Sequence, residues 1–570
     1  MPALLVAGPP MANPILAGID NGNRWSGDIV YNRVDPTNSA ETGPFSAALP
    51  LPYLTNGAGL TNPMWDMVSR GLALLKTYAS FTYSISDSTD PNYFVSDFYK
   101  PNANNVPGVA SEPGNGPILA LSPLIWDTYS DQQQAWIVLH ELSHTLGLHH
   151  VTGLPAELDF AQYSIMSYNW YQLGFLDFGE GLPLTPMALD IAVLQAKYGA
   201  PAANIGATTY ALSNFTLDLD GSDGLEQNGG GYVCIWDTSG ADSLVCNSAS
   251  GALLNLNAAT LSTAALTGDL ADVITDVAQT SRIFASLSAQ AKDEITNPLH
   301  TAGGFFSSLL AGNARAPAGF TIANGVTLEI ARGGAGADLL VGNAANNSLF
   351  GNGGKDDLYG GSGDDSLDGG AGDDQVFGGL GADSLVDTGG GANYLRGDEG
   401  DDSISGGGGF DDANGNMGND TVSGGAGDDY SVGGKDNDLL FGDGGQDIVW
   451  GNLGNDTCDG GDGNDQVRGG QGNDSVAGGA GDDFVSGDRG DDTITGGAGA
   501  DLFHGSQDAG IDRVLDFSLA EGDRVQLDPG TSYTLAPVGA DTVISMGGAN
   551  QIILVGVLLS TLTPGWIFGN

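Results

Sequence analysis

Residues 140–150 contain the side chains best suited to chemistry. They read His-Glu-Leu-Ser-His-Thr-Leu-Gly-Leu-His-His and hold four of the six histidines in the 570-residue chain. On a helix, His140 and His144 lie one turn apart on the same face, which supplies two nitrogen ligands to a zinc ion. Glu141 lies beside the first histidine, where it can accept a proton from a metal-bound water. The pattern predicts a catalytic zinc centre.

A third ligand is expected just after the helix ends. Gly147 can adopt a positive φ, which ends the helix and lets His150 return towards the metal. Three neutral nitrogens leave one coordination position open, as in catalytic zinc sites. Downstream, residues 164–168 read Ser-Ile-Met-Ser-Tyr, so that Met166 supplies a methionine turn. The alternative for the same histidines is a solvated helix surface.

The elements that would carry these residues mix helices with strands. Apolar periodicity predicts helices over residues 62–78, 131–146 and 184–199, with short strand patterns before and between them. Such a mixture predicts one α/β (α+β) catalytic domain over residues 1–205.

Residues 206–330 are expected to form a connecting β region. Within it, about 255–312 is rich in Ala, Leu and Ser and is predicted to be a helical insertion. The sequence leaves open whether Cys234 and Cys246 form a disulfide. Cys458, the third cysteine, occupies an apolar repeat position and is expected to be a buried free thiol.

From residue 333 the chain becomes periodic. The repeat is Gly-Gly-x-Gly-x-Asp-x-U-x, where U is apolar. Six repeats run to Val386, an irregular piece occupies 387–396, and twelve more repeats run from Gly397 to His504. Each repeat reads as a six-residue turn and a three-residue strand, so that only a stack of repeats buries a continuous core. This periodicity predicts an all-β parallel β-roll over residues 331–510.

The aspartates of the repeats line up in columns that would repel one another without a cation. Calcium prefers carboxylate and carbonyl oxygens, and extracellular modules bind it at about 10⁻⁴–10⁻³ M. Folding of the roll is therefore expected to require several calcium ions, and a disordered Gly/Asp-rich linker is the alternative. The predicted calcium ligands are Asp338, Asp356, Asp365, Asp374, Asp383, Asp402, Asp420, Asp429, Asp438, Asp447, Asp456, Asp465, Asp474, Asp483, Asp492 and Asp501.

Charge and hydropathy exclude some partners. Seventy acidic and 17 basic residues give a net charge of -53, which argues against nucleic-acid binding and against an anionic membrane surface. No apolar run reaches the ~18 residues of a membrane span, so membrane insertion is not expected. The N-terminus lacks the basic region of a cleaved secretory signal.

Taken together, these motifs resemble a known family. His-Glu-x-x-His-x-x-Gly-x-x-His with Ser-Ile-Met-Ser-Tyr and C-terminal nonapeptides is similar to the serralysins, secreted zinc metalloendopeptidases of the metzincin clan with RTX calcium-binding repeats. The resemblance implies that His140, His144 and His150 bind one zinc ion and that Glu141 is the general base. Tyr168 matches the additional tyrosine ligand of that family, which stabilises the oxyanion.

The resemblance also implies how the protein reaches its place of action. Serralysins are exported to the extracellular space by a type I secretion apparatus, without a cleaved N-terminal signal. Residues 511–570 resemble their C-terminal β cap and secretion signal. Expected partners are protein or peptide substrates, the type I apparatus and a protein inhibitor, and the chain is expected to be a monomer.

Two rivals remain at this point. One is a calcium-dependent structural or adhesive RTX repeat protein whose protease domain is vestigial. The other is a repeat-bearing lipase, which the absence of any Gly-x-Ser-x-Gly sequence opposes. The family pattern also has a longer segment between the third histidine and the methionine than the one between His150 and Met166.

Overall fold

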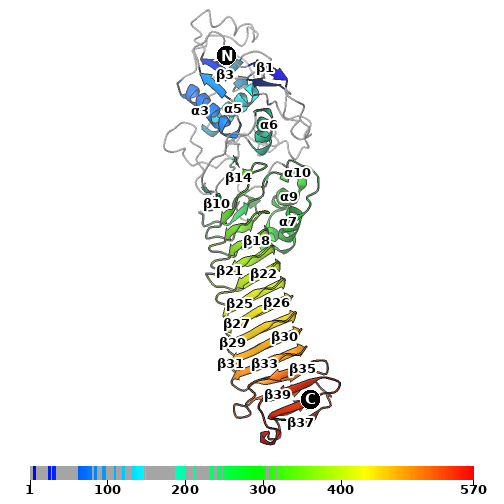
Figure 1. The fold of residues 1–570 in the computed structure, drawn as a ribbon. Coiled ribbons are helices and arrows are strands. Elements are labelled where there is room, and N and C mark those ends of the chain that lie inside the picture. The colour runs from blue at the N-terminus through cyan, green and yellow to red at the C-terminus, as the bar shows by residue number, and fades with distance from the viewer. Residues whose placement is uncertain are drawn as a thin grey trace, which may run out of the picture. The chain divides into compact units, whose positions relative to one another are not determined.

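The structure is a computed structural model of the chain (Figure 1). The chain divides into an N-terminal unit, residues 1–242, 255–266 and 287–328, and a C-terminal unit, residues 243–254, 267–286 and 329–570. The residues that the structure describes are 4–7, 23–26, 28–33, 62–79, 82–85, 93–97, 108–110, 118–121, 131–146, 148, 187–198, 209–211, 232–236, 241–246, 248–262, 264–302, 305, 307–311, 314–315 and 319–569.

A five-stranded sheet in the N-terminal unit has the order β4-β3-β5-β7-β6. Its neighbouring strands are parallel except β6, which runs antiparallel to β7. The strands are β3 (Asp28–Arg33), β4 (Thr82–Ile85), β5 (Tyr93–Asp97), β6 (Gly108–Ala110) and β7 (Ile118–Leu121). The described part of this unit therefore combines a mostly parallel sheet with helices.

Three helices of this unit were expected from apolar periodicity. They are α3 (Asn62–Tyr78), α5 (Asp131–Thr145) and α6 (Ala188–Tyr198). The first two agree with the prediction to within a residue. α6 begins later than expected, at Ala188, and the Asp190 carboxylate accepts a hydrogen bond from the Met187 N–H at 2.9 Å, which caps the helix. Among the described helices, none combines the length and the apolar character that a membrane span needs.

The expected helical insertion is present but divided between the two units. In the N-terminal unit lie α9 (Ala289–Thr296) and α10 (Pro298–Thr301), together with the parallel pair β9 (Tyr232–Ile235) and β14 (Gly319–Ile322). The C-terminal unit contains α7 (Asp269–Thr280) and α8 (Arg282–Ser286).

The repeats of the C-terminal unit form two parallel sheets, with successive strands alternating between them. One sheet contains β16 (Leu339–Val341), β18 (Asp357–Ser362), β20 (Gln375–Leu380), β22 (Asn393–Glu399), β24 (Asp411–Met417), β26 (Tyr430–Lys435), β28 (Ile448–Leu453), β30 (Gln466–Gln471), β32 (Phe484–Arg489), β34 (Leu502–Gly505) and β36 (Arg524–Leu527). The other contains β15 (Ile330–Arg332), β17 (Ser348–Phe350), β19 (Ser366–Asp368), β21 (Ser384–Val386), β23 (Ser403–Ser405), β25 (Thr421–Ala426), β27 (Leu439–Gly444), β29 (Thr457–Asp462), β31 (Ser475–Ala480), β33 (Thr493–Ala498) and β35 (Ile511–Val514). This arrangement is the predicted parallel β-roll.

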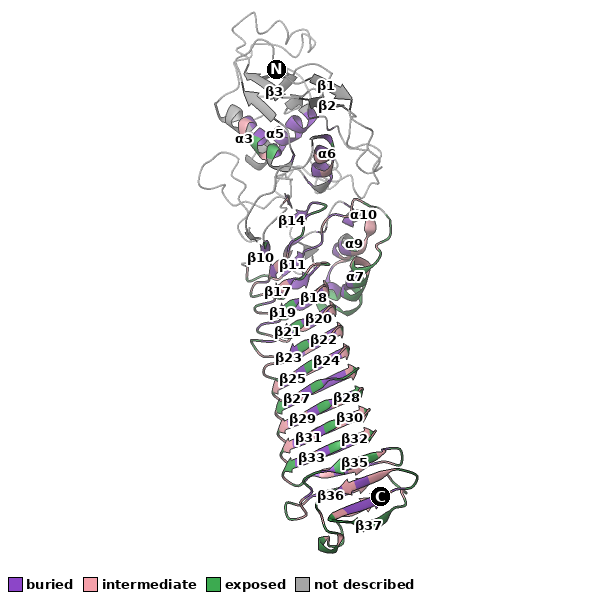
Figure 2. Ribbon diagram, viewed as in Figure 1, coloured by how far each residue is buried: buried purple, intermediate pink, exposed green. Residues whose placement is uncertain are grey.

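The register of the roll advances by two repeats per turn. Val449 of β28 pairs with Val467 of β30, which is 18 residues later, and Cys458 of β29 pairs with Val476 of β31. The U residues point between the sheets and are buried, with Val449 and Val467 fully covered and Cys458 only 1% exposed. Figure 2 shows this alternation of buried and more exposed positions along the strands. A single column of side chains from each sheet therefore makes the core.

Glycine is required in the turns where successive layers touch. Gly463 has φ 151°, and a Cβ atom there would overlap the carbonyl oxygen of Gly445 in the preceding turn. Where another residue takes a left-handed position it is often Asn or Asp, as at Asn452 (φ 76°) and Asp488 (φ 67°), because these side chains tolerate that conformation best.

Beyond the repeats, the C-terminal segment extends both sheets. β35 pairs with β39 (Gln551–Leu554), which begins the antiparallel meander completed by β38 (Asp541–Ser545) and β37 (Thr534–Val538). β36 pairs with β40 (Ile567–Gly569). Phe517 contacts Phe503 and Trp566, with ring centroids 6.0 and 5.9 Å apart, and these rings close the end of the apolar core.

Candidate functional site

Helix α5 brings two of the predicted zinc ligands together. The rings of His140 and His144 lie edge to face with their centroids 4.9 Å apart, and both side chains are buried. Glu141 is buried beside them at 6% exposure. The helix therefore presents two imidazoles at the separation expected for adjacent turns, with a carboxylate next to the first.

The backbone after the helix orients the second of these histidines. Nδ1 of His144 lies 2.8 Å from the carbonyl oxygen of Leu148, close enough for an Nδ1–H group to donate to it. That hydrogen bond selects the tautomer in which Nε2 carries the lone pair. Metal-binding histidines are commonly fixed in this way by a carbonyl or carboxylate on the other ring nitrogen.

Helix α5 is held in place by close packing against α3. Gly71 lies at the contact, where a Cβ atom would come within 2.8 Å of Leu142 Cδ1 and 3.2 Å of Val138 Cγ1. Leu72 and Leu75 of α3 are fully buried. A glycine at this point lets the two helices approach closely.

The other predicted residues of the zinc site, Gly147, His150, Met166 and Tyr168, lie outside the described residues. Across the part of the chain that the structure describes, no group of three or more His, Cys, Asp or Glu side chains is arranged to hold a metal. The donor chemistry of His140 and His144 fits zinc, and these two are the members of the predicted ligand set that the structure describes.

The repeat aspartates form two columns, one for each sheet. The even column belongs to the sheet of the even-numbered strands β16 to β36, and the odd column belongs to the sheet of the odd-numbered strands β15 to β35. Within a column, each Oδ1 accepts a hydrogen bond from the backbone N–H of the preceding member. Asp438 N donates to Asp456 Oδ1 at 2.9 Å, and Asp456 N donates to Asp474 Oδ1 at 2.8 Å. The even column comprises Asp338, Asp356, Asp374, Asn393, Asp411, Asp429, Asp447, Asp465, Asp483, Asp501 and Asp523. The odd column comprises Asn347, Asp365, Asp383, Asp402, Asp420, Asp438, Asp456, Asp474 and Asp492.

The second carboxylate oxygen of these aspartates is buried and has no hydrogen-bond partner among the described residues. Such an oxygen is costly unless a cation or donor compensates it. The unpartnered Oδ2 atoms belong to Asp356, Asp365, Asp374, Asp383, Asp402, Asp411, Asp420, Asp429, Asp438, Asp447, Asp456, Asp465, Asp474, Asp483, Asp492 and Asp501. Rows of buried anionic oxygens fit a hard divalent cation such as calcium.

Backbone carbonyls converge on the same places. A Cβ atom at Gly442 would meet both Asp447 Oδ2, at 2.6 Å, and the carbonyl oxygen of Gly460 in the next turn. Gly460 bears the same relation to Asp465 Oδ2 and the carbonyl of Gly478. The first glycine of a repeat therefore leaves room beside one carboxylate and one carbonyl oxygen, the ligand types that calcium takes.

Burial makes these carboxylates hard to ionise without a cation. Burial first, and to a smaller extent the charge of neighbouring aspartates in the same column, raise the pKa of Asp356, Asp365 and Asp438 to about 8. Desolvation and like charge both disfavour the carboxylate form. A bound divalent cation would reverse both effects.

Two positions differ from the other aspartates of the columns. Asp338 is one of the predicted calcium ligands, and its carboxylate accepts hydrogen bonds from backbone N–H groups on both oxygens, from Ala252 at 2.5 Å and Gly334 at 2.6 Å. Asp411 was not predicted, although it occupies the aspartate position of the repeat that begins at Gly406. The nine-residue spacing places Asp411 at the aspartate position, but the small side chain of Ala413 at the apolar position makes this repeat hard to recognise.

The irregular piece 387–396 does not interrupt the roll. Asn393 takes the aspartate position of the even column, and Asp374 N donates to its Oδ1 at 2.9 Å. Its Nδ2 donates to Asp387 Oδ2 and Asp411 Oδ1, both at 2.8 Å. The extra residue is accommodated in the turn, because Val376 of β20 pairs with Leu395 of β22, 19 residues later. The Asn393 amide therefore donates hydrogen bonds to the two carboxylates beside it.

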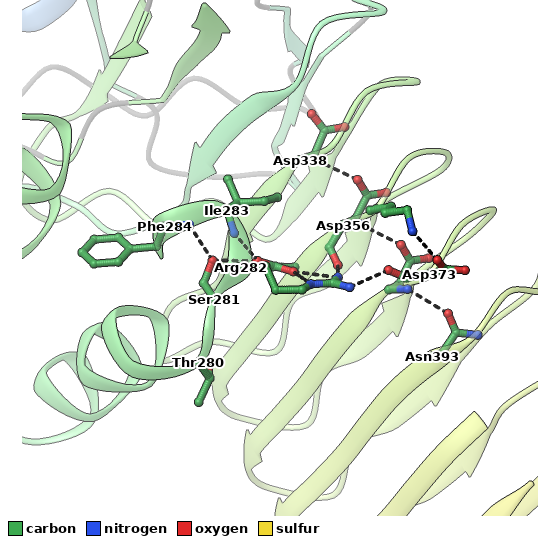
Figure 3. A network of polar contacts seen from close by, with 12 residues as sticks. Thr280, Ser281, Arg282, Ile283, Phe284, Asp338, Asp356, Asp373 and Asn393 are labelled. Atoms are coloured by element: carbon green, nitrogen blue, oxygen red, sulfur yellow. Dashed lines mark hydrogen bonds and ion pairs between the residues drawn. The ribbon is translucent and has the colours of Figure 1, made fainter. Parts of the chain in front are cut away.

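Helices α7 and α8 anchor the start of the roll through one buried carboxylate (Figure 3). Asp357 is fully buried, and its Oδ2 accepts hydrogen bonds from Ser281 Oγ at 2.7 Å and Ile283 N at 2.9 Å. Arg282 pairs with Asp357 Oδ1 at 2.8 Å and donates to the carbonyl oxygens of Asp356 and Asp373. One arginine thus ties two successive turns to the helices.

All three cysteines are buried and none forms a disulfide, which answers the open question on Cys234 and Cys246. Cys458 has the predicted character: burial raises the pKa of its thiol well above the usual value.

Comparisons with known protein families match the repeats and do not include the histidines of α5. The RTX calcium-binding nonapeptide repeat family matches residues 332–367, 350–385, 387–422, 423–458, 459–493 and 478–511. No protein of curated function matches the chain. Among solved structures, the extracellular lipase LipA from Serratia marcescens is similar at 14% identity over 66% of this chain and 69% of that chain, with a TM-score of 0.16.

A TM-score this low carries no argument about fold or activity. The family match covers less than half of the chain, and it coincides with the two columns of buried aspartates. Residues 332–511 are therefore RTX calcium-binding nonapeptide repeats folded as a parallel β-roll.

Proposed function

We propose that the chain is an extracellular protein whose C-terminal unit folds when calcium binds. The observation that carries this proposal is the set of buried, unpartnered Oδ2 atoms along both aspartate columns. Extracellular calcium reaches the ~10⁻⁴–10⁻³ M at which such modules bind, and cytosolic calcium does not. The same dependence would keep the roll unfolded before export and fold it afterwards.

Calcium binding to the full chain tests this proposal directly. Equilibrium dialysis with radioactive calcium should give several bound ions per chain, half-saturated at about 10⁻⁴–10⁻³ M. Magnesium should compete poorly, because it demands a tighter octahedral site than these turns offer. A chain that binds no calcium up to 10 mM, about ten times the upper end of that range, contradicts the proposal.

We propose as a second function the hydrolysis of peptide bonds by the N-terminal unit. It is favoured by the paired rings of His140 and His144 and by the Leu148 carbonyl that orients His144. His150 and Tyr168 would complete the ligand set. A zinc ion held there would supply Lewis acidity and lower the pKa of a bound water to about 7.

The chain's own residues would then divide the work. Glu141 would accept the proton of the attacking water and deliver it to the leaving amine. Tyr168 would donate a hydrogen bond to the oxyanion that forms on the scissile carbonyl. Met166 would lie beneath the histidines as an apolar floor. Substrates would be extracellular proteins or peptides.

Replacing Glu141 separates catalysis from zinc binding. Glu141→Ala should keep the zinc content of the wild type and lose casein hydrolysis by a factor of about 10²–10⁴. Ser143→Ala on the same helix is the matched control, since among the described residues the Ser143 hydroxyl donates back to the Leu139 carbonyl oxygen, at 2.7 Å. Full activity of Glu141→Ala would contradict the assignment of the base.

A structural or adhesive RTX protein with a vestigial protease domain is the competing interpretation. It is supported by the extent of the family match, which includes the roll and not residues 140–150. Zinc content and a gelatin zymogram distinguish the two: a vestigial domain would contain no stoichiometric zinc and clear no gelatin. Export by a type I apparatus, a protein inhibitor and a monomeric state remain predictions of the serralysin resemblance.

A further inference from the structure

The two ends of the even column are closed by backbone donors. At one end, both oxygens of Asp338 accept N–H groups, from Ala252 and Gly334. At the other end, Asp523 accepts from Asp501 N at 3.1 Å and from Ser518 N at 2.6 Å. Each terminal carboxylate of this column is therefore compensated by the protein itself.

The odd column ends differently, beyond its last repeat aspartate. Arg513 of β35 pairs with Thr493 of β33, so Asp512 takes the place next to Asp492 that an aspartate of the following repeat would have. Both side chains are only 1% exposed. Among the residues that the structure describes, no donor lies in hydrogen-bond geometry to Oδ1 or Oδ2 of Asp512 or to Oδ2 of Asp492. Three buried carboxylate oxygens thus remain without a donor at this end.

The backbone around Asp512 preserves the form of a repeat. Gly510-Ile511-Asp512-Arg513-Val514 follows the last part of the repeat, Gly-x-Asp-x-U, although the preceding loop is longer. Gly510 has φ 96°, and a Cβ atom there would overlap the carbonyl oxygen of Gly490 in the turn before it. Val514 is fully buried in the core. The chain therefore makes one more turn of the roll after the match to the repeat family ends at residue 511.

Two ionised carboxylates cannot remain adjacent in a buried site without compensation. The compensation must be a shared proton or a cation. The rest of the odd column consists of calcium-binding repeats, so a calcium ion is the compensation in keeping with its neighbours.

We propose that Asp512 and Asp492 bind a calcium ion that fastens the C-terminal β segment to the last turn of the repeats. β35 is the strand on which the meander of β39, β38 and β37 is built. The ion would therefore decide whether residues 511–554 pack on the roll. This inference rests on calcium binding by the repeats, and its test distinguishes the failure of one from the failure of the other.

Calcium stoichiometry in three full-length variants tests the site. Native mass spectrometry at saturating calcium should show one ion fewer in Asp512→Asn than in the wild type. Asp456→Asn, inside the odd column, should also lose calcium, whereas Asp523→Asn should keep the wild-type number because Asp523 is bonded to backbone donors. Asn is isosteric with Asp, so the fold is expected to survive each change.

A wild-type count in Asp512→Asn together with a loss in Asp456→Asn would overturn this inference and leave the calcium-binding repeats intact. Such a result would mean that Asp492 and Asp512 share a proton. Wild-type counts in both variants would remove calcium from the repeats as well.

A second measurement on the wild type does not depend on a variant that folds. Hydrogen exchange of the β35 and β39 amides should slow by about tenfold or more between calcium-free and calcium-saturated protein. Equal protection of β35 in both states, with protection of β31 gained only when calcium is present, would contradict a calcium ion at Asp512 and leave the calcium-binding repeats intact.

Discussion

Helix α5 and the β-roll both bury side chains that can bind metals, but they build their sites in opposite ways. On α5, His140 and His144 occur once, and the proposed zinc site needs His150 and Tyr168 from elsewhere in the chain. In the roll, glycine, aspartate and an apolar residue recur at the same positions in most repeats, so that successive turns offer the same types of ligand. A site of the first kind depends on the whole surrounding fold, while sites of the second kind depend on one another.

The difference predicts how each part responds when one component is removed. Loss of a residue on α5 should abolish a single function, because nothing repeats it. Loss of one repeat residue should be partly compensated by the turns above and below, as in other solenoids in which stability is shared between neighbours. Loss of the cation common to all turns should affect the whole roll.

Calcium removal should therefore have the largest effect and should separate the two regions. A calcium-selective chelator at pH 7.5 should abolish the β signal of the roll in far-ultraviolet circular dichroism, since the buried Oδ2 atoms then repel without compensation. The helical signal of α3, α5 and α6 should persist. Simultaneous loss of helix and strand would show that the two regions do not fold independently.

Acid should partly replace calcium. The pKa values of Asp356, Asp365 and Asp438 are raised to about 8 in the folded state, against about 3.9 in unfolded chains. Protonation therefore favours the calcium-free fold fully below about pH 4, and this stabilisation is lost as the pH rises towards 8. Calcium-free protein prepared by dialysis should show more β structure at pH 5 than at pH 8.

The opposite order, with more β structure at pH 8 than at pH 5, would show that these carboxylates are not buried in the calcium-free protein. A urea titration at each pH gives the same comparison as a midpoint, without reliance on the amplitude of the spectrum.

Removing Arg282 should have an intermediate effect, confined to the start of the roll. Arg282→Ala deletes the contacts to Asp357 and to the carbonyls of Asp356 and Asp373. Because the arginine side chain is 41% exposed, solvent weakens these contacts, and a loss of about 1–2 kcal/mol is expected. Urea unfolding at saturating calcium would measure it.

Arg489→Ala is the matched control for Arg282→Ala. Arg489 forms an ion pair with Asp508 in which both side chains are exposed, Arg489 at 61% and Asp508 at 59%. The control substitution should change the urea midpoint little. Equal effects of the two substitutions would mean that α8 does not anchor the roll.

The smallest effect should come from Cys458→Val. The thiol occupies a U position that Val449 and Val467 fill in the flanking repeats of the opposite sheet, and it takes part in no disulfide. A volume-conserving apolar exchange usually costs less than about 1.5 kcal/mol. Thermal unfolding with calcium should be nearly unchanged, and a large loss would indicate that the weak hydrogen bond from the thiol to the Arg468 carbonyl oxygen, at 3.7 Å, contributes to stability.

The repeat region was almost wholly predictable because its information is local and repeated. The nine-residue phase alone predicted which positions point into the core, and the structure buries even Ala413 and Ser431, whose side chains are the least apolar at that position. Helix α3 was predicted equally well, since Leu72 and Leu75 follow a helical period.

The features that could not be predicted from the sequence depend on contacts between residues that are far apart in the chain. Residues 387–396 looked like an interruption because one extra residue before Asn393 shifts it out of the nine-residue phase. Only the pairing of β20 with β22 shows that this segment is a turn of the roll. Asp338 looked like its neighbours, yet its second donor comes from Ala252, 86 residues away. Arg282 gave no signal, since its partners lie in the roll and not in its own helix.

The 18-residue register restricts how such a chain can change its length. Duplication of two repeats inserts a complete turn and leaves every later strand in its own sheet. Duplication of one repeat would exchange the sheets of all later strands, so that β35 and β36 would follow the wrong columns. Tandem duplications and deletions that persist in descendants of this chain should therefore add or remove repeats in pairs, whereas single-residue insertions survive inside turns, as the turn before Asn393 illustrates.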